Sequence, residues 1–316
     1  MITYFTLDQG RVVETTAEAG GPILLCVNPD ANERARLISQ YQLDEHNLDS
    51  ALDPAELPRI ELDSNHLAVI FKHPKRYTAK DNLVFHINSL GLFLYRDRLI
   101  VISPDDAATF QGRTFSKIQN LQMLFLRILS SCVTHFFNHL QVINDIASEL
   151  ETKLVHSMEN FQLLQMFTIE KSLVYYVNAI SANGRVIERL KANARNDQTD
   201  GLTPVMIEFV DDLAIENAQC LEQAQVYANV FTGMMDARAS IVNNNLNVLM
   251  KRLTVINVVF MPLNVLAGVC GMSEYTMMTK NIPWPISYGL FMLGLVFMGW
   301  LTYKILGLVE RQHVST

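Results

Sequence analysis

The chain has 316 residues, of which 49% are hydrophobic and 18% charged, and its formal net charge is −7. This length leaves room for a large cytosolic-type domain and a further segment. The acidic balance argues against nucleic acid as a partner and is compatible with cations. The four cysteines (positions 26, 132, 220 and 270) form no C-x-x-C pair, so we expect reduced thiols rather than a disulfide framework or a zinc knuckle.

The first part of the chain alternates strand and helix signals. Runs rich in Val, Ile, Phe and Tyr predict strands over residues 23–28, 66–73, 83–87 and 92–103. Residues 32–42 predict a helix, with its capping region at residues 28–32. The opening stretch MITYFTLDQG lacks the basic and apolar regions of a cleaved signal peptide. We therefore expect residues 1–115 to form a cytoplasmic α/β domain.

Helical periodicity dominates from Ser116 onward. Apolar residues at three- and four-residue spacing, without proline, predict long antiparallel helices over 116–158 and 160–195, within a helical segment 116–204. The polar stretch NDQTDGLTP ends this segment. No proline occurs between residue 205 and Pro262, so one helix is predicted over 205–272. A helix of that length indicates a coiled coil, a membrane span, or both.

Two stretches near the C-terminus are long enough to cross a bilayer. Leu253–Met272 has 20 residues without a charge and Asn281–Tyr303 has 23, whereas a span needs about 20. They predict that the stalk helix 205–272 continues into the first span, followed by a periplasmic loop 273–282, a second span 283–308 and a tail 309–316. Lys251 and Arg252 precede the first span, and Lys304 and Arg311 lie at or after the end of the second. Lys280 is the one basic residue in the loop between the spans. This asymmetry predicts that both termini are cytoplasmic.

A polar stripe follows the predicted stalk helix into the first span. Steps of four and three residues give the positions Asp236, Ser240, Asn243, Asn247, Met250, Thr254, Asn257, Met261 and Asn264. Such a period marks one seam of a helix bundle, and polar groups in a membrane face a bundle interior or water. A single hairpin has no interior, so we expect several copies to assemble around an axis.

The stripe has two interpretations. Asn257 and Asn264 could only hydrogen-bond helices together, at about 0.6–2 kcal/mol each, but the length of the stripe favours a pore. Met250 and Leu253 lie where the stripe meets the membrane. Rings of these side chains would form either a hydrophobic constriction that gates by dewetting or ordinary coiled-coil core.

An acidic run precedes the stripe. No Lys or Arg occurs between Arg195 and Arg238, a stretch with the eight carboxylates Asp197, Asp200, Glu208, Asp211, Asp212, Glu216, Glu222 and Asp236. A charge run is usually a solvated face, but repeated in every copy it would concentrate cations. The adjacent Asp211 and Asp212 also suit hard divalent ions, which take oxygen ligands.

Signals for other chemistry are weak. His135 and His139 are four residues apart on a predicted helix, as in a two-histidine metal site, but no third ligand is evident nearby. We therefore interpret them as ordinary surface or packing residues. The sequence contains no nucleophile–base set, phosphate loop or cofactor fingerprint, so we expect neither an enzyme nor a bound cofactor.

The segment NVLMKRLTVINVVFMPLNVLAGVCGMS (247–273) resembles the stalk and first span of the CorA family of divalent-cation transporters. The family pattern is Asn before Met-Lys-x-Leu-Thr, then Phe-x-Pro-Leu and Gly-x-x-Gly-Met-Asn. The matching positions are Asn247, Met250, Lys251, Leu253, Thr254, Phe260, Pro262, Leu263, Gly268, Gly271 and Met272. ALDPAELPRIE (51–61) resembles a second family stretch, and the order of segments agrees over almost the whole chain.

The resemblance implies an α+β membrane protein of the bacterial inner membrane that forms a funnel-shaped homopentamer. Its pore would be lined by Asn243, Asn247, Met250, Leu253, Thr254, Asn257, Met261 and Asn264, and its selectivity entrance formed by Gly271, Met272, Ser273 and Glu274. Ser273 stands where the family has Asn. A hydroxyl is shorter than a carboxamide, so the ring should grip hydrated Mg²⁺ less well.

The family also implies a regulatory cytoplasmic metal site between neighbouring subunits. Its stalk carboxylate falls on Asp212, and its N-terminal carboxylate on Ser50, directly after Asp49. Either Asp49 takes the place of Ser50 or the site is weakened. We expect Asp49, Asp211, Asp212 and Asp236 to bind cations on the cytoplasmic side. The expected function is passive transport of Mg²⁺ or of transition metals such as Zn²⁺ or Co²⁺. The alternatives are a weakly selective cation channel, and a non-conducting scaffold or metal sensor.

Overall fold

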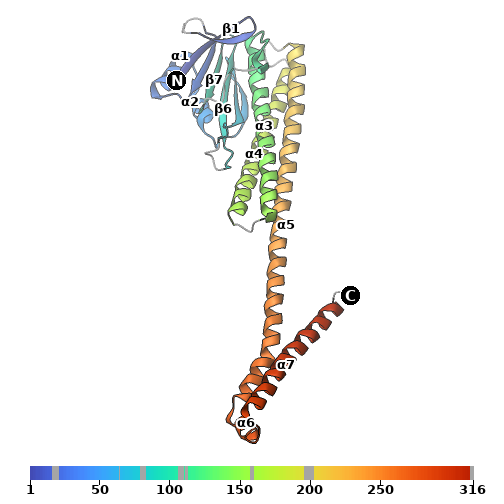
Figure 1. The fold of residues 1–316 in the computed structure, drawn as a ribbon. Coiled ribbons are helices and arrows are strands. Elements are labelled where there is room, and N and C mark those ends of the chain that lie inside the picture. Colours follow the sequence, from blue (N-terminus) through green and yellow to red (C-terminus); the bar gives the residue numbers. More distant parts are fainter. Residues whose placement is uncertain are drawn as a thin grey trace. The chain divides into compact units, whose positions relative to one another are not determined.

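The computed structural model describes residues 1–316 except 16–20, 64, 79–82, 106–109, 111–112, 157–159, 196–202 and 314–316. The chain divides into two compact units, Met1–Met235 and Asp236–Thr316. The first unit therefore includes both the predicted α/β domain and the two helices that follow it (Figure 1).

The first unit is built on a mixed seven-stranded sheet. In chain order its strands are β1 (Ile2–Asp8), β2 (Arg11–Thr15), β3 (Ile23–Val27), β4 (Arg59–Leu62), β5 (His66–Pro74), β6 (Ile87–Tyr95) and β7 (Leu99–Ser103). They lie in the order β2-β1-β3-β7-β6-β5-β4. The central pair β3 and β7 is parallel, and the other neighbouring pairs are antiparallel.

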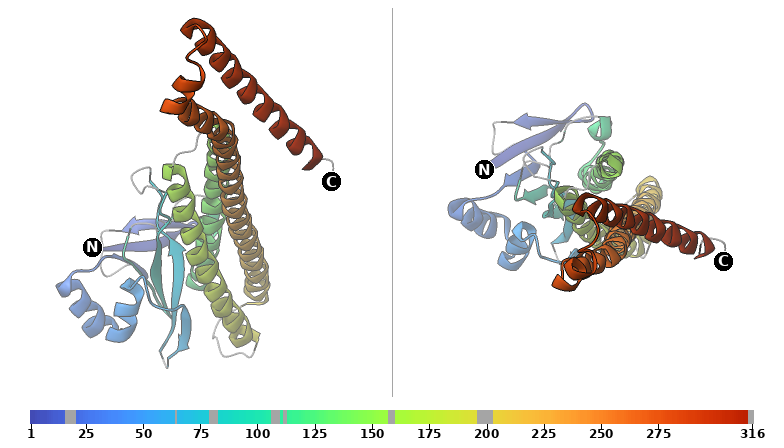
Figure 2. Two further views of the ribbon diagram at one scale, coloured as in Figure 1. Left: turned by 90° about the horizontal axis from the view of Figure 1, so that it is seen from below. Right: turned by 60° about the horizontal axis from the view of Figure 1, so that its bottom comes forward.

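Helices cover both faces of this sheet. The short helices α1 (Ala31–Tyr41) and α2 (Glu45–Leu52) lie on one face, and the long helices α3 (Leu121–His156) and α4 (Asn160–Arg195) on the other (Figures 1 and 2). Alternate side chains of a strand point to opposite faces. In β3, Ile23 and Leu25 accordingly join the core under the long helices, while Leu24 and Cys26 join the core under α1 and α2. This double coverage explains why β3 is apolar throughout.

Several sequence predictions are confirmed. The predicted strands at 23–28 and 66–73 correspond to β3 and β5, and the predicted helix at 32–42 corresponds to α1. Asp30 caps α1, because its side chain accepts a hydrogen bond from the Glu33 amide while Glu33 reaches back to the Asp30 amide. This capping box satisfies two amides that a helix start leaves without partners.

The strand prediction over 83–87 is wrong, and the prediction over 92–103 is confirmed only in part, because the range holds two strands and not one. Leu83 has a positive φ of 65°, and the Phe85 amide donates a hydrogen bond of 3.2 Å to Ser172 Oγ of α4, so this segment is held by a helix instead of a strand. Residues 92–103 form parts of two strands, because a tight turn closed by the 2.8 Å bond from Tyr95 N to Arg98 O separates β6 from β7. The strands β1, β2 and β4 and the helix α2 were not predicted.

The long helices agree well with expectation. α3 and α4 fall within the predicted ranges 116–158 and 160–195, after the short 3-10 helix Arg113–Phe115. α3 begins at Leu121 because the Asn120 side chain accepts a 2.9 Å hydrogen bond from the Met123 amide. The helix predicted over 205–272 is observed as α5, Pro204–Cys270, with 67 residues.

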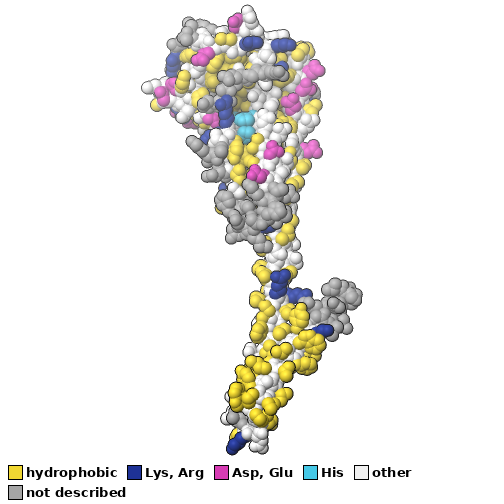
Figure 3. Space-filling view, viewed as in Figure 1, with side chains coloured by type: hydrophobic (Ala, Val, Ile, Leu, Met, Phe, Trp, Pro, Cys, Tyr) yellow, Lys and Arg dark blue, Asp and Glu magenta, His cyan; other side chains and the backbone are white. Residues whose placement is uncertain are grey.

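The second unit is a helical hairpin formed by the C-terminal part of α5, the short helix α6 (Ser273–Met278) and α7 (Trp284–His313). α6 lies in the segment predicted as a loop, and α7 continues past the predicted end of the second span at residue 308. α5 and α7 are each long and apolar enough to cross a membrane, and no residue in the most apolar stretch of either is buried. Figure 3 shows hydrophobic side chains over the visible surface of this hairpin.

Candidate pore and cation sites

The hairpin covers one side of α5 and leaves the polar stripe uncovered. Residues Val255, Val259, Leu263 and Leu266 are half-buried, and a Cβ at Gly299 of α7 would lie 3.7 Å from Leu263 Cδ1. At about 100° per residue, the stripe lies on roughly the opposite side of α5. All nine stripe positions, Asp236 to Asn264, and Leu253 are exposed in the single chain. The predicted pore face is therefore available to other copies.

The polar side chains of the stripe differ in whether they find a hydrogen-bond partner within the hairpin. Thr254 satisfies its hydroxyl within α5, through a 2.9 Å bond to the Met250 carbonyl. Asn257 and Asn264 make no side-chain hydrogen bond to any residue in the described part of the chain. A polar side chain inside a bilayer needs a partner or water. Both amides must therefore face something outside the single hairpin.

The hydrophobic stripe residues Met250 and Leu253 are 65% and 61% exposed. They contribute to no core within their own chain, although each is large and apolar. The two interpretations of these residues, a constriction and a bundle core, both require side chains from another copy.

The predicted selectivity entrance lies at the junction of α5 and α6. After Cys270 the Gly271 amide still donates to the Ala267 carbonyl at 3.0 Å, and the Met272 amide donates to the Val269 carbonyl at 3.2 Å. Ser273 then begins α6 and is exposed. Glu274 also lies in α6, but its side chain is outside the described part of the structure.

The two glycines of this segment have different environments. A Cβ on Gly271 would lie 3.3 Å from the Ala267 carbonyl oxygen, which is tight for a side chain. A Cβ on Gly268 would meet nothing within 4 Å. Glycine costs a helix about 1 kcal/mol relative to alanine, and the single chain gives no steric reason for Gly268.

Of the four predicted cytoplasmic cation ligands, two are held by basic side chains. Asp49 accepts a 2.8 Å bond from Arg34 Nη1, and Asp211 lies 2.9 Å from Lys191 Nζ. The acidic run on α5 is therefore partly neutralised by α4, which the sequence analysis did not anticipate.

The other two ligands, Asp212 and Asp236, are exposed. Partial burial, and next the charge of Asp212, raise the pKa of Glu216 above its ordinary value, against the opposing effect of Arg127. Among the described residues no three His, Cys, Asp or Glu side chains lie close enough to hold a metal ion. Within the described residues, the predicted cation ligands of one chain therefore form no three-ligand cluster.

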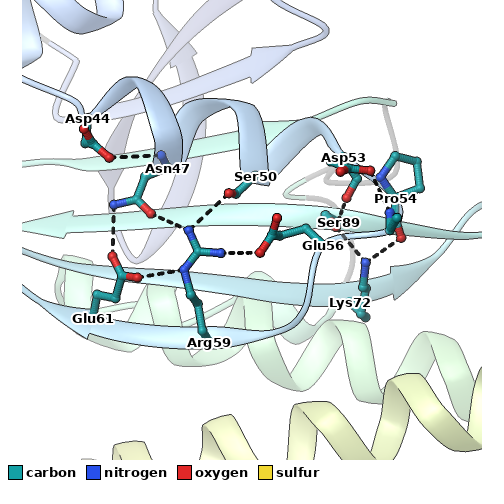
Figure 4. Close-up of polar contacts among 11 residues, drawn as sticks. Asp44, Asn47, Ser50, Asp53, Pro54, Glu56, Arg59, Glu61, Lys72 and Ser89 are labelled. Carbon is teal, nitrogen blue, oxygen red and sulfur yellow. Dashed lines mark hydrogen bonds and ion pairs between the residues drawn. The ribbon is translucent and has the colours of Figure 1, made fainter.

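A network of polar contacts around Arg59, which the sequence analysis missed, includes the Ser50 hydroxyl (Figure 4). The Arg59 guanidinium forms ion pairs with Glu56 at 2.6 Å and Glu61 at 2.7 Å. It also donates to Asn47 Oδ1 at 2.9 Å and to Ser50 Oγ at 3.1 Å. Ser50 is only 2% exposed. Its hydroxyl thus faces Arg59 rather than solvent, and a metal ion has no access to it.

The histidine pair has a structural role. His139 Nδ1 lies 2.7 Å from the Tyr176 hydroxyl, and the His135 and His139 rings meet edge to face at 4.6 Å. Burial lowers the pKa of both imidazoles to about 4. Both rings are therefore neutral near pH 7 and pack between α3 and α4, which decides between the surface and packing roles that the sequence left open.

Comparisons with known proteins agree with this architecture. Residues 23–306 match the family described as CorA-like Mg²⁺ transporter protein. The cobalt/magnesium transport protein CorA of Methanocaldococcus jannaschii is 24% identical over 273 residues, which cover 82% of this chain and 81% of that protein.

Two complete structures share the fold. The magnesium transporter CorA of Methanocaldococcus jannaschii superposes with a TM-score of 0.77 at 21% identity, covering 96% of each chain. The full-length CmaX protein superposes with a TM-score of 0.70 at 13% identity, covering 97% of each chain. Because the family match spans most of the sequence, this chain belongs to the CorA-like Mg²⁺ transporter family.

Proposed function

We propose that several copies of this chain form a membrane pore that conducts divalent cations down their gradient. The observation that carries this proposal is the exposed stripe, above all Asn257 and Asn264, which have no partner within the described part of their own chain. Family membership and the named cobalt and magnesium transport activity of the relative support divalent cations as the substrate.

The stripe suits hydrated ions. Asparagine offers a carbonyl oxygen and an amide, and threonine a hydroxyl, so rings of Asn257, Thr254 and Asn264 would contact the water shell of a passing ion. Mg²⁺ gives up its water reluctantly, so contact through water needs no full dehydration. Asn243, Asn247 and Met261 would continue the lining, and Met250 with Leu253 would form its apolar ring.

The expected assembly is a homopentamer in the inner membrane with both termini in the cytoplasm. Lys251 and Arg252 precede the first span, which supports this orientation. Gly271, Met272, Ser273 and Glu274 would surround the outer entrance. Close packing between copies would also supply the missing reason for Gly268.

Regulation by a cytoplasmic divalent ion would have to use ligands from two copies. Asp212 is the best placed, since it is exposed and shares its helix face with Glu216. Asp236 is the first position of the stripe and is also exposed. Asp49 and Asp211 would first have to break their ion pairs with Arg34 and Lys191. We therefore expect them to contribute less to cation binding than Asp212.

The test is ion flux into liposomes that contain the purified full-length protein. Mg²⁺, Co²⁺, Zn²⁺ and Na⁺ are compared for wild type, Asn257→Leu and Asn257→Gln. The pore proposal expects Asn257→Leu to abolish divalent flux while the oligomer, measured by native mass spectrometry, stays intact. Asn257→Gln keeps the amide and should retain flux.

The other outcomes separate the alternatives. Loss of both oligomer and flux in Asn257→Leu would mean that the amide only holds helices together. Comparable flux of Na⁺ and Mg²⁺ in wild type would indicate a weakly selective channel. No flux of any ion through an intact oligomer would leave a scaffold or sensor.

A further inference from the structure

The first unit contains a cavity of about 760 Å³ that is separate from the stripe and from the predicted cation ligands. Its walls come from α4, from residues 54–58 after α2, and from residues 84–87 before and at the start of β6. Small-ligand pockets have volumes of roughly 300–1,000 Å³. The cavity is therefore large enough for a compact organic molecule.

Lys72 of β5 lines this cavity and is only 6% exposed. Its ammonium donates to the Pro54 carbonyl at 2.6 Å and to Ser89 Oγ at 2.9 Å, and Ser89 in turn donates to the Asp53 carbonyl at 2.5 Å (Figure 4). An ammonium has three donors, so one remains beyond these two contacts with described residues.

The charge of Lys72 has no acidic partner in contact with it. No carboxylate of the described residues lies within ion-pair distance, and the nearby Glu56 carboxylate is held by Arg59 at 2.6 Å. Burial lowers the pKa of Lys72 to about 8, with the charges of Asp53 and Glu56 opposing the shift. The side chain is thus mainly cationic at pH 7. A buried cation without a counter-ion is unfavourable, and an anion in the cavity would relieve this.

The remaining wall is mixed: it includes Glu56, which is paired with Arg59, and polar residues of α4, together with a group of apolar and aromatic side chains. Leu57, Phe167 and Tyr175 are 70%, 55% and 55% exposed and lie around the cavity, with Phe85 buried deeper. Exposed large apolar side chains that gather at a concave surface mark binding sites. A second cation, the exposed Lys171, also lines the cavity.

We propose that this cavity binds a small organic anion that joins a flat apolar ring to a phosphate or carboxylate group. The anionic group meets Lys72, and the ring packs among Leu57, Phe167 and Tyr175. The divalent cations of the proposed transport function do not fit here, because Lys72 and Lys171 repel them. The site is independent of the pore, so its failure in a test would leave the flux experiment unaffected.

The first experiment uses pyridoxal 5′-phosphate, an aromatic phosphate with an aldehyde, on the full-length protein in detergent at pH 8. The neutral form of the Lys72 amine condenses with the aldehyde, forming an imine and releasing water. Borohydride then adds hydride to the imine carbon, and a proton from solvent completes a stable secondary amine. We expect peptide mass spectrometry to detect saturable labelling of Lys72. Excess 1-naphthyl phosphate should slow it about tenfold or more, and inorganic phosphate alone much less.

The second experiment uses neighbouring residues of α4, because replacing the buried Lys72 could itself disturb folding. Tyr175 and Val174 are 55% and 51% exposed, and Tyr175 lines the cavity whereas Val174 does not. Tyr175→Glu should weaken 1-naphthyl phosphate binding about tenfold or more, since it removes an aromatic contact and adds a like charge. Val174→Glu should change the affinity by less than about twofold.

Three results would overturn the proposal. The first is absence of Lys72 labelling in the intact protein. The second is labelling without protection by 1-naphthyl phosphate. The third is an equal effect of the two glutamate substitutions. Labelling that appears only after the oligomer is dissociated is a case of the first result, because a neighbouring copy of the chain would then occupy the cavity.

Discussion

Gly91 of β6 lies against Ala51 of α2 with no room for a side chain, and Gly91→Ala should destabilise the first unit. A Cβ at this position would lie 2.5 Å from Ala51 Cβ and 2.9 Å from Phe93 Cε2. Carbon atoms pack at about 3.5–4.0 Å, so both contacts overlap. Ala51 and Phe93 are each fully buried, and neither can move into solvent.

The expected magnitude follows from these contacts. Overpacking of a buried site costs about 1–3 kcal/mol. The lower entropy of unfolded alanine offsets about 0.4–1 kcal/mol of this. A net loss of about 1–2 kcal/mol should lower the Tm of a unit of this size by about 2–8 °C, measured by circular dichroism on the full-length protein in detergent.

A double-mutant cycle provides the control. Ala51→Gly removes the closer of the two contacts, although glycine in α2 costs about 1 kcal/mol by itself. In that background Gly91→Ala should cost about 1 kcal/mol less than in the wild type. An equal loss of Tm in both backgrounds, or a rise in Tm for Gly91→Ala alone, would refute the packing argument.

Two further predictions concern the histidine pair and the outer entrance. Burial lowers the pKa of His135 and His139 to about 4 in the folded chain, whereas an unfolded histidine has a pKa of about 6.5. Between these values the unfolded chain binds more protons than the folded chain. The free energy of unfolding that the neutral pair contributes above pH 6.5 is therefore lost as the pH falls towards 4. His139→Gln should flatten the dependence of Tm on pH in this range, and an unchanged slope would contradict the assignment. Ser273→Asn places a longer carboxamide at the entrance, so Mg²⁺ uptake should rise relative to Co²⁺ in competition assays with liposomes. An unchanged ratio of the two ions would mean that Ser273 does not contact the ion's water shell.

The helical part of the fold could be predicted because its signals are local and long. α3, α4 and α5 carry uninterrupted periodicity without proline, and their observed ends lie within a few residues of the predicted ones. The error in predicting a strand over 83–87 arose because a tertiary contact determines the backbone conformation of this segment. The segment around Phe85 is β-rich in composition, but its amide bonds to Ser172, a residue 87 positions later in the chain. No local pattern contains that partner.

The exposure of the polar stripe was easier to predict from the sequence than the surroundings of the predicted cation ligands. A stripe follows from the geometry of one helix, so its exposure could be expected from spacing alone. The availability of Asp49 and Asp211 depends on whether a base lies nearby. Arg34 is 15 residues from Asp49, and Lys191 lies on a different helix from Asp211. Charge counting along one segment cannot detect such neighbours.

The Arg59 network also limits which single substitutions could place a metal-binding carboxylate at position 50. Ser50→Asp would place a new acid at a site that is 2% exposed, close to a guanidinium already paired with Glu56 and Glu61. The added charge would face Arg59, in competition with two existing acids, and would not reach a metal ion at the surface. Placing a metal-binding carboxylate at position 50 would therefore require changing the surroundings of Arg59 first and position 50 second, so the order of the two substitutions matters.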